Sequence, residues 1–142
     1  MAQIHPYIHF NGNTEEAFSF YQSIFGGNFS SVVRYKDLHT ESDLLDHSES
    51  NKIMHIALPI GQCSMLLGSD VPNFLGVVNE KENRSKISIQ ADSKEEAFEI
   101  FNKLSVNGEV EVPFSESTLG VYFGMLRDKF GIEWMINFDS NK

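Results

Sequence analysis

The chain has a single cysteine, Cys63, among its 142 residues, so an internal disulfide framework is excluded. Basic residues are also scarce, with 11 Lys and Arg against 20 Asp and Glu and a net charge of −9. Nucleic acids and anionic lipid surfaces attract clustered Lys and Arg, so we expect neither a nucleic-acid nor a membrane partner. No apolar run is long enough to span a bilayer, and the N-terminal residues lack the features of a signal peptide. We therefore expect a cytoplasmic protein.

What the chain does contain is a repeated pattern, Glu-Glu-Ala-Phe, at Glu15–Phe18 and again at Glu95–Phe98. Each copy follows a residue that favours the cap position of a helix, Asn13 or Ser93, with a Glu three residues later. This spacing predicts a capping box, in which the cap side chain and the Glu each accept a backbone N–H. Strand-like runs precede and follow both helices. The pattern therefore predicts one small unit that is built twice.

Apolar periodicity predicts the order strand, helix, strand, strand, strand in both copies. We expect the first unit at residues 1–70 and the second at 86–142, joined by a linker at 71–85 within a single domain. The acidic segment Asp37–Asn51 has no sustained apolar period, so we interpret it as a solvated loop, with a lid over a cavity as the alternative. The expected strands are Ile4–Phe10, Phe29–Tyr35, Ile53–Ile60, Cys63–Leu67, Lys86–Ala91, Glu109–Phe114, Val121–Leu126 and Ile132–Phe138.

These elements predict an α+β fold with a cavity. A unit of this kind covers one face of its curved sheet with a helix and leaves the other face bare. A single unit buries too little apolar area to be stable alone. Two units that pair through their bare faces would enclose a barrel-like cavity suited to a small molecule.

The order of several motifs resembles the PhnB-like branch of the vicinal oxygen chelate superfamily, which includes glyoxalases, extradiol dioxygenases and bleomycin-resistance proteins. The resemblance implies two βαβββ modules in a glyoxalase/bleomycin-resistance-like fold. One departure is Leu119-Gly120, where many relatives have Trp-Gly. The motifs that carry the resemblance are Pro6-Tyr7-Ile8-His9-Phe10-Asn11-Gly12-Asn13, Glu15-Glu16-Ala17, Phe20-Tyr21, Phe25-Gly26-Gly27 and Asp128-Lys129-Phe130-Gly131 with Trp134.

The resemblance also implies a site for one divalent metal ion, with ligands from the first and last strands of each module. It places His5, Lys86, Met135 and the neighbourhood of Leu66 at the four ligand positions. Lys is cationic near neutral pH, Leu has no lone pair, and a thioether binds hard divalent ions poorly. Only His5 suits a metal, so we expect no metal and no other cofactor.

An alternative metal set remains open. Two imidazoles and a carboxylate can hold iron or zinc. Since His5 and His9 are four residues apart on a strand, they lie too far apart to share one ion. The alternative therefore combines one of them with His55 and Glu133.

Strand alternation predicts which side chains face the cavity. The histidines are either acid–base groups or polar residues satisfied by their neighbours. Lys86 has a lowered pKa, binds an anionic group of a substrate, or reaches solvent from the edge of the strand. Trp134 is expected in the core, and Cys63 is expected to be an inert buried thiol. The cavity candidates are His5, Tyr7, His9, His55, Leu66, Lys86, Ser88, Gln90, Tyr122, Glu133, Met135 and Asn137.

The combined pattern favours a homodimer that binds a small, partly aromatic or anionic metabolite without a metal. Two alternatives stay open: a metal-dependent lyase, isomerase or dioxygenase, and a drug-sequestering resistance protein. Members of the PhnB-like branch often carry a methyltransferase label. The chain has no glycine-rich strand–helix turn that would seat a nucleotide-like cofactor, so methyl transfer is not expected. No catalytic residue is assigned.

Overall fold

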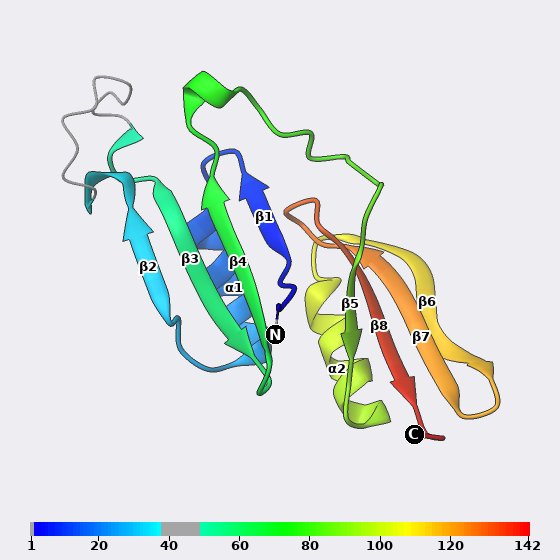
Figure 1. The fold of residues 1–142 in the computed structure, drawn as a ribbon. Helices are drawn as coiled ribbons and strands as arrows, with labels where there is room; N and C mark the ends of the chain where they lie inside the picture. The colour runs from blue at the N-terminus through cyan, green and yellow to red at the C-terminus, as the bar shows by residue number, and fades with distance from the viewer. Residues whose placement is uncertain (1, 38–48) are drawn as a thin grey trace. The chain divides into compact units, whose positions relative to one another are not determined.

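Both halves of the chain have the same order of elements in the computed structural model, which describes residues 2–37 and 49–142. The chain divides into a first unit, Met1–Val78, and a second unit, Asn79–Lys142 (Figure 1). The division falls within residues 71–85, where a linker is expected. Each unit has four strands in one sheet and one longer helix, which confirms the α+β class. Neither of these helices combines the length and hydropathy that a membrane span requires among the described residues.

The first unit has a mixed sheet in the order β1-β4-β3-β2, with β1 parallel to β4 and the other neighbours antiparallel. Helix α1 packs on one face of this sheet (Figure 1). A Cβ built on Gly68 would lie 2.7 Å from the ring of Phe18, so a residue without a side chain lets the helix approach β4. The elements are β1 (Tyr7–Phe10), α1 (Thr14–Phe25), β2 (Ser31–Arg34), a 3-10 turn (Tyr35–Asp37), β3 (Ile53–Ile60), β4 (Ser64–Asp70) and a second 3-10 turn (Asn73–Leu75).

The second unit repeats this arrangement, with the order β5-β8-β7-β6 and β5 parallel to β8. Here Gly124 takes the role of Gly68, because a Cβ on it would lie 2.7 Å from the ring of Phe101 in the helix. The elements are β5 (Ile87–Gln90), α2 (Lys94–Leu104), β6 (Glu109–Thr118), β7 (Val121–Arg127) and β8 (Glu133–Asp139).

Several boundaries differ from the expected ones. The first strand begins at Tyr7, and Ile4 is 97% exposed rather than part of the helix-covered face. Cys63 is exposed, so the prediction of a buried thiol is wrong. It lies in the turn before β4 begins at Ser64, where strand alternation does not apply. Of the expected loop Asp37–Asn51, residues 38–48 lie outside the described part of the chain.

The two helices begin in different ways. At α2 the predicted cap is confirmed: Ser93 Oγ accepts the Glu96 N–H at 3.0 Å, and the Glu96 carboxylate accepts the Asp92 N–H at 2.8 Å. At α1 the prediction is wrong, because the Asn13 side chain makes no capping hydrogen bond. A carboxylate oxygen of Asp70, at the end of β4, accepts the Thr14 N–H at 3.0 Å instead. The first helix is therefore capped by a side chain that is distant in sequence.

Asp70 is almost fully buried, at 2% exposure. Besides the Thr14 N–H, it accepts the Thr14 hydroxyl at 2.5 Å and the Ile53 N–H at 2.8 Å. It thereby joins the start of α1, the start of β3 and the end of β4. A buried carboxylate is tolerated because these donors replace its lost hydration.

Asp128 is a buried carboxylate of the second unit, at 3% exposure. It accepts the backbone N–H groups of Phe130 and Ile132 at 2.8 and 3.0 Å, which shapes the turn between β7 and β8. Its other oxygen accepts the indole N–H of Trp134 at 2.9 Å. Trp134 is fully buried, as the sequence predicts for a core residue.

Candidate functional site

Each sheet has one face that its own helix covers and one that it does not, which we call the open face. In the first unit, Phe10 and Gly68 contact Phe18 of α1. Because strand side chains alternate between faces, Tyr7 and His9 lie on the open face. His55 is there too, since its neighbour Ile56 pairs with Gly68 on the covered face.

Three of the predicted residues come together on the first open face. The rings of Tyr7 and His9 meet edge to face, with centroids 5.4 Å apart and an interplanar angle of 77°. The rings of Tyr7 and His55 lie 6.1 Å apart at 35°. Tyr7 and His9 come from β1 and His55 from β3, with β4 between them. The result is an aromatic cluster that can stack against a flat molecule and exchange hydrogen bonds with it.

Tyr35 adds a group that the sequence analysis missed. Its hydroxyl donates to the Asp70 carbonyl at 3.1 Å. Burial raises the pKa of Tyr35, and the neighbouring Tyr7, Asp70 and Glu49 raise it further. Tyr35 lies just after β2 ends, so strand alternation could not place it.

Both ring nitrogens of His5 interact with neighbouring residues of the first unit. Its Nδ1 accepts the Met65 N–H at 3.2 Å, and its Nε2 lies 3.2 Å from the side-chain oxygen of Gln3. A neutral imidazole whose Nδ1 accepts must carry its proton on Nε2. Neither nitrogen then has a lone pair for a metal, and the ring acts as a structural link between the residues before β1 and β4.

In the second unit, the predicted alternation places most polar candidates on the open face. Ser88 pairs with Met135, and Gln90 pairs with Asn137, whose amide donates to Ser88 Oγ at 3.0 Å. The intervening residues of both strands lie toward α2, where Ile136 is fully buried. Strand alternation is reliable here because apolar and polar residues alternate strictly.

Lys86, Glu133 and Arg127 form an ion-pair network at one end of this face. The Glu133 side chain is only 1% exposed, and its two oxygens meet Lys86 Nζ and, at 2.8 Å, Arg127 Nη2. Lys86 also lies 3.3 Å from Glu111. The hydrogen bond to Glu133 is the main reason that the pKa of Lys86 is raised. The hypothesis of a lowered Lys86 pKa is therefore wrong, because the sequence did not reveal its acidic partners.

The pKa of Glu133 is lowered. Burial acts to raise it, but the Lys86 hydrogen bond and the charges of Lys86 and Arg127 outweigh burial. A lowered carboxylate pKa stabilises the fold above its ordinary value of 4.5 and stops doing so as pH falls through the lower folded-state pKa. The raised pKa of Lys86 stabilises the fold below 10.5, and this contribution is lost as pH rises through the higher folded-state pKa.

We predict that the wild-type protein exceeds Glu133→Gln in melting temperature by a constant margin near neutral pH. The margin should shrink as pH falls below 4.5, because the wild-type carboxylate then becomes protonated and uncharged like the amide. Thermal melts of both proteins across this range provide the measurement. A margin as large in strong acid as at neutrality would contradict the prediction.

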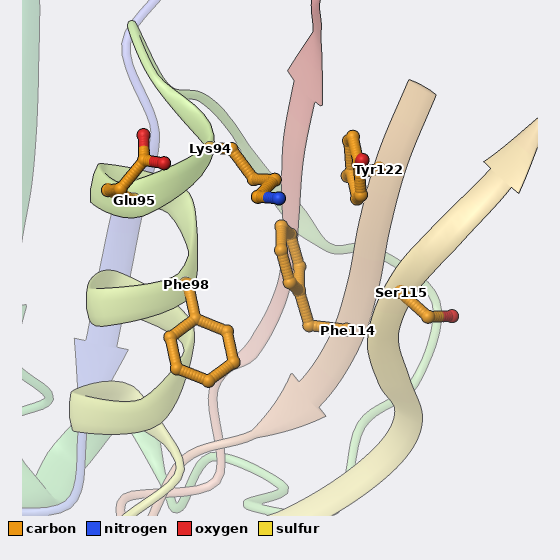
Figure 2. Close-up of a pocket in the computed structure, with 6 residues that line it drawn as sticks. All are labelled: Lys94, Glu95, Phe98, Phe114, Ser115 and Tyr122. Carbon is orange, nitrogen blue, oxygen red and sulfur yellow. The ribbon is translucent and has the colours of Figure 1, made fainter. Parts of the chain in front are cut away.

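Two predicted cavity residues lie on the covered faces instead. Leu66 pairs with Leu58, and both are buried on the same face as Gly68. Tyr122 lies on the same face as Gly124, and its ring stacks on Phe114 with centroids 6.2 Å apart. Residues 121–126 are almost all apolar, so their sequence has no alternation that could assign the faces. Tyr122 instead lines a pocket beside α2 (Figure 2).

The predicted ligand residues do not fit a divalent metal ion. No three His, Cys, Asp or Glu side chains converge as metal ligands within the described residues. His5 has no free lone pair, Lys86 is a cation, and Glu133 is held by two cations of its own unit. Met135 adds only a soft thioether. That no metal is bound stays a prediction.

Arg127 and Glu111 are further residues of the second open face that the sequence analysis missed. Arg127 ends β7, and alternation from Gly124 on the covered face assigns it to the open face. Glu111 lies in β6, where the register shifts between Val110 and Val112. Such a shift breaks the period of two, so no sequence signal could place Glu111.

Comparison with known proteins gives consistent matches along nearly the whole chain. The family model described as 3-demethylubiquinone-9 3-methyltransferase matches residues 2–137. Protein YjdN of Escherichia coli is 26% identical over 135 residues, which cover 93% of this chain and 92% of YjdN.

Solved structures of similar proteins also match almost the full length of this chain. Protein PA1353 of Pseudomonas aeruginosa is 36% identical, with a TM-score of 0.81 and 98% of each chain covered. The PhnB protein of Bacillus cereus is 24% identical, with a TM-score of 0.71, over 96% of this chain and 99% of that one. A glyoxalase-related enzyme from Fulvimarina pelagi and a fosfomycin resistance protein from Listeria monocytogenes are 18% and 12% identical to this chain, and these two matches show only that the fold is shared.

Proposed function

Because this chain belongs to the 3-demethylubiquinone-9 3-methyltransferase family, the PhnB-like branch of the vicinal oxygen chelate superfamily, we propose that it binds a small aromatic metabolite without a metal ion. The proposed site lies on the open face of the first unit. The observation that carries the proposal is the cluster of Tyr7, His9 and His55 on the first open face.

The chemistry of this cluster supports a flat ligand with polar edges. A tyrosine and two histidines present ring faces for stacking and nitrogen and hydroxyl groups that both donate and accept hydrogen bonds. Tyr7 is 47% exposed, so its ring is accessible. The second unit has neutral polar groups on its own open face, from Ser88, Gln90 and Asn137.

The ion-pair network narrows the choice of ligand. From the sequence alone, Lys86 is a cation that could bind an anionic ligand. In the structure, Glu133 and Glu111 already balance its charge. A strongly anionic ligand would have to compete with Glu133, whose carboxylate is buried between two cations. The proposal therefore favours a neutral aromatic metabolite over an anionic one.

Methyl transfer, which the family description names, is not part of the proposal. A nucleotide-like cofactor is commonly held by a glycine-rich turn between a strand and the start of a helix. The corresponding turns here are Asn11–Asn13 and Ala91–Ser93, and Gly12 is their only glycine. Neither turn resembles such a site.

We also propose that the protein is a homodimer. Light scattering gives the mass in solution, and the mass of a monomer would contradict this proposal.

Isothermal titration with catechol, phenol and nicotinamide as flat aromatic probes, after treatment with EDTA, tests the binding proposal. We expect at least one probe to bind, and Tyr7→Ala to weaken its binding about tenfold through lost stacking. Phe20→Ala, which removes an aromatic ring from α1, is the matched control and should leave the affinity unchanged. Unchanged binding in Tyr7→Ala and His9→Ala would contradict the proposed site.

The metal content of the purified protein tests the alternative that this chain is a metal-dependent enzyme. We expect elemental analysis to find no stoichiometric zinc, nickel, iron or manganese in the purified protein. Probe binding that appears only after one of these metals is added would favour a metal-dependent lyase, isomerase or dioxygenase and would overturn the metal-free proposal.

A further inference from the structure

We propose that the pocket beside α2 is a separate binding site for a flat aromatic carboxylate. The pocket lies wholly within the second unit and has a volume of about 420 Å³. Small-molecule sites typically have roughly 300–1,000 Å³. Its lining residues are Lys94, Glu95, Phe98, Phe114, Ser115 and Tyr122 (Figure 2).

Three aromatic rings form the walls of the pocket. Phe114 stacks on Tyr122, with an interplanar angle of 20°. Phe98 meets Phe114 edge to face, with centroids 6.2 Å apart. Phe114 is anchored from the core side by Phe101, at 5.8 Å. Since Phe98 is 55% exposed, a planar ligand that covers it would remove apolar surface from water.

Lys94 supplies the charge complementarity. Its ammonium lies 5.2 Å from the centre of the Tyr122 ring. It makes no ion pair with any residue that the structure describes, unlike Lys86 and Lys103. Figure 2 shows Lys94 extending toward the rings, whereas the Glu95 carboxylate points away from them. A ligand carboxylate would therefore meet an uncompensated cation at the edge of an aromatic surface.

This site is distinct from the open-face site of the proposed function. Phe114 and Tyr122 lie on the covered side of the sheet, because both rings belong to the aromatic group that contacts Phe101 and Phe98 of α2. The open-face residues of the second unit, such as Met135 and Asn137, project from the other side of the sheet. A ligand in one site does not contact the lining of the other through this sheet.

The test is a titration of the full chain with 2-naphthoate, followed by backbone amide NMR. We expect amide shifts at Lys94, Phe98 and Ser115. Shifts confined to residues such as Tyr7, His9 and His55 would overturn this proposal while supporting the open-face site. Shifts at Phe98 and Phe114 that depend on protein concentration alone would show that a second copy covers the pocket, and would also overturn it.

Variants separate the contributions of charge and stacking. Lys94→Gln should weaken 2-naphthoate binding about three- to tenfold but leave the uncharged probe 2-naphthamide unaffected. Phe98→Ala should weaken both probes, by about tenfold. Lys103→Gln removes a lysine from the last turn of the same helix and should change neither affinity. Equal loss of both probes in Lys94→Gln, or no loss in Phe98→Ala, would contradict the assignment.

Discussion

Asp128→Ala is expected to lower the free energy of unfolding by about 3–6 kcal/mol, the largest effect that we predict for a single substitution. The variant leaves three donors without their carboxylate: the N–H groups of Phe130 and Ile132 and the indole N–H of Trp134. A buried donor that loses its partner, such as the Trp134 indole, costs about 1–3 kcal/mol, and the two part-buried N–H groups each cost less. Urea denaturation followed by fluorescence provides the measurement, because Trp134 is the only tryptophan and reports directly on this site.

Two further variants serve as comparisons for the loss of stability in Asp128→Ala. Asp128→Asn keeps the oxygen that accepts from Phe130 and Ile132 but turns an amide toward Trp134, so it should lose only about 1–3 kcal/mol. Asp92→Ala removes an exposed carboxylate before α2 and should stay within about 0.5–1 kcal/mol of wild type. A loss below about 1 kcal/mol in Asp128→Ala would show that water or a rearranged turn satisfies the donors.

Glu133→Ala is expected to cost about 3 kcal/mol. Removing one partner of a buried ion pair typically costs about 3–5 kcal/mol, because the opposite charge is left without compensation. The lower end applies because Lys86 and Arg127 keep 29% and 17% of their side-chain surface exposed and can regain some hydration. Chemical denaturation at neutral pH is the appropriate measurement.

The neighbouring Glu111 offers a matched control. Glu111→Ala removes a carboxylate that is 35% exposed and pairs with the same Lys86 at 3.3 Å. An exposed ion pair contributes little, so the cost should be below about 1 kcal/mol. Equal losses in Glu111→Ala and Glu133→Ala would mean that burial of Glu133 does not set the strength of the network.

Local patterns account for the parts of the fold that the sequence predicted. The capping of α2 depends on Ser93 and Glu96, which are three residues apart, so the sequence alone contains the whole interaction. The open-face positions of Ser88 and Gln90 follow from their alternation with Ile87 and Ile89. Such patterns reflect backbone geometry over a few residues and need no knowledge of distant contacts.

Distant partners explain the predictions that failed. The predicted cap of α1 is wrong because Asp70, which lies 56 residues after Thr14, accepts the hydrogen bond from the start of the helix. The alternative of a lowered pKa for Lys86 is wrong because its partner Glu133 lies 47 residues away in the chain. Tyr122 was assigned to the wrong face because its strand is apolar on both sides, and only its contact with Phe114 decides the matter.

The sequence by itself therefore determined the order of elements, the α+β class and the faces of the strands in which apolar and polar residues alternate. Only the tertiary structure decided how charges are paired, which carboxylates are buried, and that an aromatic pocket exists beside α2. The physical reason is the separation along the chain of the residues that interact. Hydrophobic periodicity is encoded within one element, whereas ion pairs, long-range caps and pockets arise from side chains that only the folded sheet brings together.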